Sequence, residues 1–369
     1  MRCGRARRLP RGLWWSKPPA GQRFPSSTIA RPLRFEVPPT EQADRLRAAV
    51  HKMDEGSLGE ATRLLTALHE ELPDNGLVLH ELALCYRLRK QPEKAIELLE
   101  PYVAQLPADT LAAYGSALDE AGRTAEAEKA LRAGIQKHRD GGILYSELGT
   151  LLSNAGRTDE ALEIYQQGIS ADPRTAPNYL HAATLLASAH HGGAALIYGE
   201  VFRLLEPATD RSREMAVMMA KILQDNVKVT TEDGKPAVRL TLAPPPVVDA
   251  KEASAAELPM ENVFEMLFGA GLSLANPPIH SLEQVHQARS TYLAALREGK
   301  GTPALREYPL TRWQLALDAA GLLETYDYWL YSPAYEEDVK EWASRPGAKQ
   351  KLEKLIDYLS THPLFPETR

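Results

Sequence analysis

Residues 142–173 read GILYSELGTLLSNAGRTDEALEIYQQGISADP, which is two amphipathic helical patterns with a short turn between them. Gly149 and Ala161 are small residues that let the backbones of two crossing helices approach closely. Gly156 marks the turn, and Pro173 ends the second helix because proline lacks an amide donor and disfavours helix in the residue before it. The stretch therefore predicts a helix–turn–helix unit.

The same unit recurs along the chain. Ala127, Ala161 and Ala195 follow one another at a constant interval, and the same interval separates Ala61 from Ala95. The step from Ala95 to Ala127 is shorter, so one unit lacks two residues. Self-similarity at a fixed period of this size indicates a stacked array of helix pairs.

The pattern resembles that of the tetratricopeptide repeat family over about residues 42–209. The small residues of five successive first helices are Ala49, Ala83, Gly115, Gly149 and Ala183, and those of the second helices are Ala61, Ala95, Ala127, Ala161 and Ala195. The turn glycines are Gly56, Gly122 and Gly156, and the closing prolines are Pro73, Pro107, Pro173 and Pro207. The resemblance implies a mostly helical α-solenoid of five helix–turn–helix repeats, whose concave wall of first helices receives extended peptides or helices.

Four positions depart from the family pattern. The first unit has Arg45 where the family has a large apolar residue, which suits a terminal repeat with a solvated face. Arg139 replaces the closing proline of the third unit. The fifth unit has His190 in place of the turn glycine and Gly199 where the family has a bulky residue. The family pattern therefore determines the geometry of the fifth unit less closely than that of the others.

Polar side chains on the first helices are not explained by the packing pattern, and they form the expected partner-binding groove. They are His80, Glu81, Arg87, Asp109, Ser116, Asp119, Glu120, Ser146, Glu147, Thr150, Asn154, His181, Thr184 and Ser188. Arg87 is the only cation in this set. Electrostatic complementarity therefore favours a basic or neutral protein or peptide partner over an acidic one. The alternative is that the set is only a solvated polar face.

The rest of the chain divides by composition. Residues 1–40 are expected to form a disordered basic leader rich in Pro and Arg, and residues 41–209 the five repeats. A capping helix over 210–226 and a β-hairpin over 227–243 are expected next, because the hydrophobic period changes there from 3.6 to 2. A linker over 244–259 then leads to an aromatic-rich helical region over 260–369.

Charge is distributed unevenly. The net charge is −6, and residues 1–35 carry nine Arg and Lys with no acid, so the remainder carries −6 − 9 = −15. An acidic body disfavours nucleic acid as the partner. The leader has two interpretations, a disordered tail or misassigned start and an organelle targeting segment. No stretch approaches the roughly 18 apolar residues of a membrane-spanning helix, so none is expected, and the compartment stays open.

Nine tyrosine and tryptophan residues gather near the C-terminus. They are Tyr308, Trp313, Tyr326, Tyr328, Trp329, Tyr331, Tyr335, Trp342 and Tyr358. One interpretation is a recognition pocket, and the other is a core that joins the C-terminal helices to each other and to the array. Helical patterns in this region cover residues 261–272, 281–296, 310–323, 335–343 and 348–359.

No catalytic residue, cofactor or metal site is expected. His69 and His80 are each followed by glutamate, as in the helical motif of zinc proteases, but Pro73 and Leu84 stand where the second histidine is required. Phosphate-binding loops and nucleophile elbows are missing from the sequence, and Cys85 fits a buried helix position.

The sequence thus predicts a non-catalytic scaffold or adaptor. The alternative is an enzyme or enzyme subunit whose repeats recruit substrate. Its site would lie beside the C-terminal tyrosines, with Asp318, Glu324 or Asp327 as the acids.

Overall fold

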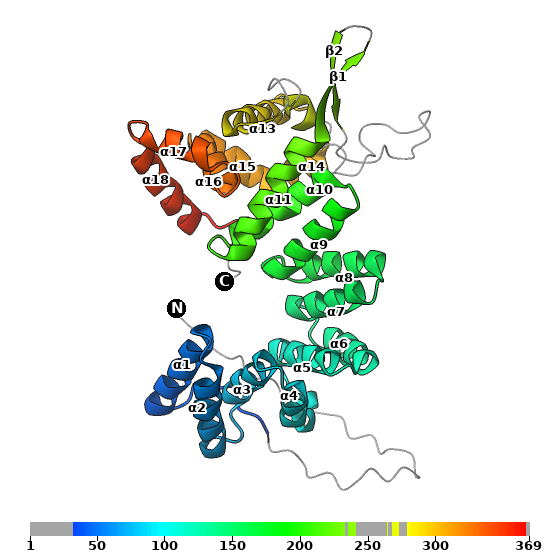
Figure 1. Cartoon of the computed structure of the whole chain (residues 1–369), viewed down its shortest axis with the longest axis vertical. Coiled ribbons are helices and arrows are strands. Elements are labelled where there is room, and N and C mark those ends of the chain that lie inside the picture. Colours follow the sequence, from blue (N-terminus) through cyan, green and yellow to red (C-terminus); the bar gives the residue numbers. More distant parts are fainter. Residues whose placement is uncertain (1–31, 233–234, 241–263, 265–267, 273–278, 367–369) are drawn as a thin grey trace.

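The computed structural model describes residues 32–232, 235–240, 264, 268–272 and 279–366. Most of the expected leader, the linker over 244–259 and half of the helical pattern over 261–272 lie outside these residues. Figure 1 shows a curved stack of helix pairs whose last members pack against a second group of helices. None of the described helices is both long and apolar enough to cross a bilayer.

Five helix pairs build the stack between residues 40 and 205. The first helices are α1 (Thr40–Asp54), α3 (Gly76–Leu88), α5 (Ala108–Glu120), α7 (Gly142–Asn154) and α9 (Ala176–Ser188). The second helices are α2 (Leu58–Glu71), α4 (Pro92–Leu99), α6 (Thr124–Lys137), α8 (Thr158–Ala171) and α10 (Gly192–Leu205). The small residues lie where the helices of a pair cross: a Cβ atom at Gly115 would lie 2.6 Å from a methyl carbon of Leu131.

The turn inside each helix pair has a residue in the left-handed region. The φ angles are 76° at Gly56, 58° at Lys90, 78° at Gly122, 76° at Gly156 and 62° at His190. Glycine adopts this region without steric cost, whereas a residue with a Cβ atom does not. Lys90 and His190 therefore keep the geometry of the other turns at some cost in stability.

The shortened second unit differs in its connection to the third. Helix α4 ends at Leu99 and continues as the 3₁₀ helix η1 (Glu100–Gln105), which contains Pro101. A proline inside an α-helix removes a backbone hydrogen bond, which explains the change of helix type. Two residues then lead to α5, whereas four residues separate α2 from α3, and this accounts for the two missing residues.

Helix α11 (Asp210–Asn226) covers the end of the fifth pair. A Cβ atom at Gly199 of α10 would lie 2.8 Å from the sulfur of Met215 and 3.0 Å from the sulfur of Met219. Both methionines are buried. The missing bulk at Gly199 thus makes room for α11, and the departure from the repeat pattern has a packing reason.

Two strands follow α11. Strand β1 (Val227–Glu232) pairs antiparallel with β2 (Lys235–Leu240), and Val229 lies opposite Val238. The strands begin where the hydrophobic period changes to two, which is the period of a β-strand.

The remaining helices form the C-terminal group. They are α13 (Leu282–Arg297), α14 (Pro303–Glu307), α15 (Pro309–Ala319), α16 (Leu323–Tyr331), α17 (Glu336–Ser344) and α18 (Ala348–Thr361). The helix expected over 310–323 forms as α15, but it ends at Ala319 because the chain turns at Gly321, whose φ is 70°. Helix α16 was not anticipated. Its rings point in all directions because the helix is buried on nearly every side, so it has no polar stripe.

One hydrophobic core joins this C-terminal group to the end of the array. It includes Tyr179 and Phe202 from the repeats, Met219 from α11, and Tyr326 and Tyr331 from α16. The rings pack against one another: Trp313 meets Tyr326 edge to face at 5.2 Å between centroids. For most of the C-terminal aromatic residues, the core interpretation is therefore the one that the structure bears out.

Candidate partner-binding groove

The first helices form the inner wall of the array. Neighbouring first helices α3, α5, α7 and α9 touch one another, whereas the second helices make fewer contacts with each other. In a stack of two layers, the layer with the closer neighbours lies on the concave side, and the curvature in Figure 1 agrees with this. We call the accessible side chains of α1, α3, α5, α7 and α9 the inner wall, and those of the second helices the outer face.

Hydrogen bonds between repeats connect several of the expected groove residues. The Arg87 guanidinium in α3 donates to Glu120 in α5, with Nη2 and Oε1 2.9 Å apart. The Ser116 hydroxyl in α5 donates to Glu147 in α7, with Oγ and Oε2 2.5 Å apart. His80 also bonds the Thr110 hydroxyl at 3.0 Å. These bonds run from one repeat to the next and fix the spacing of the wall.

Several carboxylates of the wall are not neutralised. Glu81 and Asp109 have no hydrogen-bonding partner among the described residues. Within that part of the chain, Asp119 accepts a side-chain hydrogen bond only from the neutral Thr124 hydroxyl, at 2.7 Å. Burial, and then the nearby charge of Asp54, raise the pKa of Glu81. Because Arg87 is paired with Glu120, the wall keeps an excess of negative charge.

Two of the expected groove residues are not available to a partner. Ser146 is 2% exposed and Ser116 is 8% exposed, so both belong to the packing between helices. Thr150 is partly buried; its hydroxyl donates to the Ser146 carbonyl at 2.9 Å and lies 3.2 Å from the Tyr165 hydroxyl. A serine one helical turn away from a core position cannot be assigned to wall or core from the sequence, because small polar side chains fit both.

The far end of the wall is less charged. His181 stacks on Tyr165 with 5.2 Å between ring centroids, and burial lowers the pKa of its imidazole. Thr184 and Asn154 are exposed. The hydroxyl of Thr184 donates to the carbonyl of Leu180 at 2.8 Å, and the Ser188 hydroxyl donates to the carbonyl of Thr184 at 3.0 Å.

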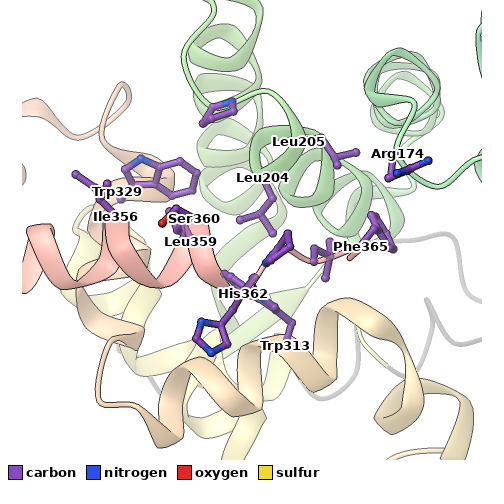
Figure 2. A pocket seen from close by; sticks show the side chains of 13 residues that line it. Arg174, Leu204, Leu205, Trp313, Trp329, Ile356, Leu359, Ser360, His362 and Phe365 are labelled. Atoms are coloured by element: carbon purple, nitrogen blue, oxygen red, sulfur yellow. Dashed lines mark hydrogen bonds between the residues drawn. The ribbon is translucent and has the colours of Figure 1, made fainter. Parts of the chain in front are cut away.

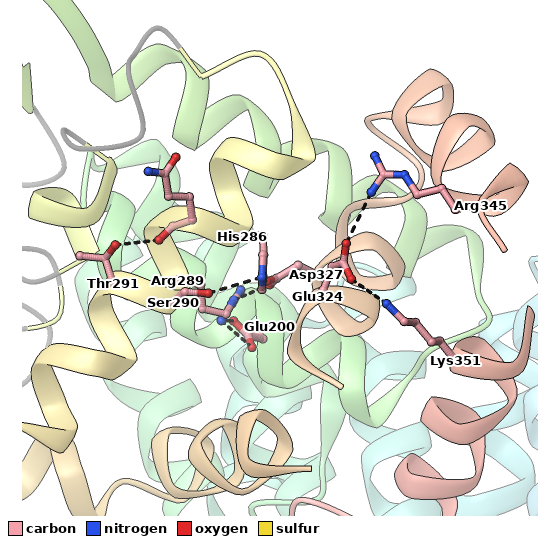
Figure 3. Close-up of polar contacts among 10 residues, drawn as sticks. Glu200, His286, Arg289, Ser290, Thr291, Glu324, Asp327, Arg345 and Lys351 are labelled. Atoms are coloured by element: carbon pink, nitrogen blue, oxygen red, sulfur yellow. Dashed lines mark hydrogen bonds and ion pairs between the residues drawn. The ribbon is translucent and has the colours of Figure 1, made fainter. Parts of the chain in front are cut away.

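A buried ion network anchors the C-terminal group to α10, as Figure 3 shows. Arg289 of α13 donates to both oxygens of Glu200 at 3.1 and 3.0 Å and to Asp327 of α16 at 2.5 Å. Gln314 and the Tyr326 hydroxyl also donate to Glu200, at 2.6 and 2.8 Å. A signal for this network is present in the sequence, because Glu200 and Arg289 stand at core positions of helices that are otherwise apolar there.

Beside this network, Ser290, His286 and Asp327 lie in a row like the nucleophile, base and acid of a catalytic triad. His286 Nδ1 lies 2.8 Å from Asp327 Oδ2, and Ser290 Oγ lies 3.5 Å from His286 Nε2. The second distance exceeds the roughly 2.6–3.2 Å expected between a nucleophile and its base. Asp327 is buried and also bound to Arg289, so the geometry favours a structural role.

The fold defines this chain as an α-solenoid protein with a C-terminal helical group. Residues 52–118 and 118–188 each match the family model described as Tetratricopeptide repeat. The array is therefore a tetratricopeptide repeat array, as the pattern of small residues led us to expect. No curated protein matches the chain.

Several solved structures are similar to part of this chain. PilF of Pseudomonas aeruginosa is 20% identical, with 50% of this chain and 85% of that chain covered and a TM-score of 0.40. A thermophilic TPR protein of Thermus thermophilus is 18% identical, with 49% and 98% covered and a TM-score of 0.42. YrrB, described as a TPR protein with an unusual peptide-binding site, is 16% identical, with 47% and 92% covered and a TM-score of 0.31.

Proposed function

We propose that this protein is a scaffold or adaptor that binds a basic or neutral segment of a partner protein along the inner wall. The observation that carries the proposal is the charge of that wall. Arg87 and Glu120 neutralise each other, while Glu81, Asp109 and Asp119 lack a cationic partner among the described residues. Stacked helix pairs offer an extended concave surface, which suits an extended segment better than a compact ligand.

The charge of the wall supports a preference rather than a strong affinity. Exposed charges act mainly on the rate of association and on the rejection of wrong partners. An acidic peptide would meet repulsion from α3, α5 and α7 in turn. The same repulsion disfavours nucleic acid, whose phosphates require clustered cations.

The enzyme alternative has less support. Each of the three carboxylates that it names is paired with a cation: Asp318 with Arg297, Glu324 with Lys351 at 3.1 Å, and Asp327 with Arg289. A carboxylate held by a cation is a weaker base and nucleophile than a free one. The proposal of a scaffold therefore stands ahead of it.

The test uses two charge-reversal variants with the same change in net charge. Asp119→Lys with Glu147→Lys alters the inner wall, and Glu97→Lys with Glu163→Lys alters exposed residues of α4 and α8 on the outer face. A basic peptide is first selected from a random display library on the wild-type protein. Its affinity is then measured by fluorescence anisotropy at low and high salt.

We expect the inner-wall variant to weaken binding about tenfold at low salt and less at high salt, because salt screens exposed charges. The outer-face variant should stay within about twofold of wild type. Equal effects of the two variants, or selection of acidic peptides by the wild-type protein, would refute the inner wall as a binding site for basic segments.

A further inference from the structure

A pocket of about 450 Å³ lies between the end of the array and the C-terminal helices. Leu204 and Leu205 of α10 form one side, Trp313 of α15 and Trp329 of α16 form another, and the segment after α18 closes it with Phe365 (Figure 2). This volume falls within the range of small-molecule sites, which is about 300–1,000 Å³.

The segment that closes the pocket is held in place on both sides. The Trp313 indole nitrogen donates to the His362 carbonyl at 2.8 Å. Phe365 stacks on Tyr179 of α9 with 6.4 Å between centroids and 23° between ring planes. These two contacts hold this wall of the pocket in place.

The lining is apolar and carries no acid. Of its thirteen residues, ten are Leu, Ile, Pro, Phe or Trp, and the others are Arg174, Ser360 and His362. Ile356 is 56% exposed, so part of the apolar lining faces solvent. Arg174 stands at the end of the pocket opposite Trp329 (Figure 2). Its Nε atom is 3.7 Å from Asp172, longer than a hydrogen bond, so most of its donors stay available.

A second cation lies behind the tryptophan wall. The guanidinium carbon of Arg203 is 5.1 Å from the centroid of the Trp329 ring. Arg203 is 3% exposed, its Nε donates to the neutral Ser212 hydroxyl at 3.1 Å, and its Nη1 has no partner among the described residues. Burial lowers the pKa of Arg203 to about 10. Because no carboxylate of the described residues pairs with it, this buried cation gives this side of the pocket a positive potential.

We propose that this pocket binds a small organic anion with an apolar body, a medium-chain aliphatic carboxylate. Its chain would lie against Trp313 and Trp329, and its carboxylate would meet Arg174 at the end of the pocket opposite Trp329. Burial of the chain supplies the affinity, at about 0.8 kcal/mol for each methylene removed from water. The absence of any acid among the lining residues selects an anion over a cation. The site is separate from the inner wall, so this proposal does not depend on the proposed function.

Isothermal titration calorimetry on the full chain tests the proposal with decanoate, below its micelle-forming concentration. The variants are Arg174→Glu, which reverses the charge at the end opposite Trp329, and Ile356→Asp, which places a charge on the apolar lining. Leu88→Asp is the matched control, since Leu88 of α3 is 54% exposed and does not line the pocket. All three side chains are exposed, so the variants should fold.

We expect saturable binding of one decanoate per chain, weakened at least about fivefold by each pocket variant and unchanged by Leu88→Asp. Decyltrimethylammonium, a cation with a chain of the same length, should bind at least about tenfold more weakly than decanoate. Lack of saturable binding, equal affinity for the two amphiphiles, or equal effects of Ile356→Asp and Leu88→Asp would overturn the proposal.

Discussion

At the scale of single residues, the buried ion network is the group of side chains on which the stability of the fold depends most. Arg289, Glu200 and Asp327 are all buried, and they come from helices far apart in the sequence. Removing one partner from such a network leaves an uncompensated charge in a low dielectric, which costs more than the pair itself contributes.

Arg289→Ala should therefore lower the free energy of unfolding by about 3–5 kcal/mol. Arg297→Ala is the control, because Arg297 pairs with Asp318 at the surface and should cost at most about 1 kcal/mol. Urea denaturation followed by circular dichroism measures both. Similar losses in the two variants would contradict the structural role that we assign to the network.

His286 makes part of this stability depend on pH. The hydrogen bond to Asp327 raises the pKa of His286 above its usual 6.5, although burial and, to a smaller extent, the charge of Arg289 oppose this rise. A raised pKa in the folded protein means that the pair stabilises fully below about pH 6.5, and that this contribution disappears as the pH rises through the folded value.

Wild type should therefore lose stability relative to His286→Gln as the pH rises from about 6 to about 9. The measurement is the difference between the two melting temperatures across that range. A difference that stays constant with pH would show that His286 does not bind Asp327 as a cation.

At the scale of elements, the turn inside each helix pair is the most regular feature. Lys90 and His190 occupy the left-handed position that glycine holds in the other three pairs. The left-handed conformation costs a residue with a Cβ atom roughly 1–2 kcal/mol more than it costs glycine. Part of this advantage of glycine is cancelled, because glycine has more conformational freedom to lose when the chain folds.

His190→Gly should therefore raise the free energy of unfolding by about 1 kcal/mol, and Gly156→Ala should lower it by about the same amount. A Cβ atom at Gly156 would have no atom within 4 Å, so the second variant reports backbone strain alone. Thermal unfolding measures both changes, and shifts of the same sign would contradict this account of the turns.

The elements also show what the sequence could predict. The ten array helices follow from small residues at a fixed period, because this period reflects how two backbones cross. Helix α16 does not follow from any period, since its rings are buried on nearly every side. On the inner wall, helix geometry predicts the exposure of Asp109 and Glu120, whereas the burial of Ser146 depends on the packing between repeats.

At the scale of the whole molecule, the array and the C-terminal group share one core and one ion network. The long-range partners of Glu200 lie on α13, α15 and α16, so far along the chain from α10 that no local pattern predicts contact. The inner wall and the apolar pocket lined by Trp313 and Trp329 are two separate surfaces of one connected body.

Site-specific photo-crosslinking tests the proposed use of the inner wall most directly. A photoreactive amino acid is placed at Asp109 or Asn154 on the inner wall, and at Glu97 or Glu163 on the outer face, all of them exposed. The selected basic peptide is then added to each protein, and crosslinks are identified by mass spectrometry. We predict crosslinks from the two inner positions and background levels from the two outer ones. Crosslinks that form chiefly from Glu97 or Glu163 would contradict the central claim that this array holds its partner on the concave side.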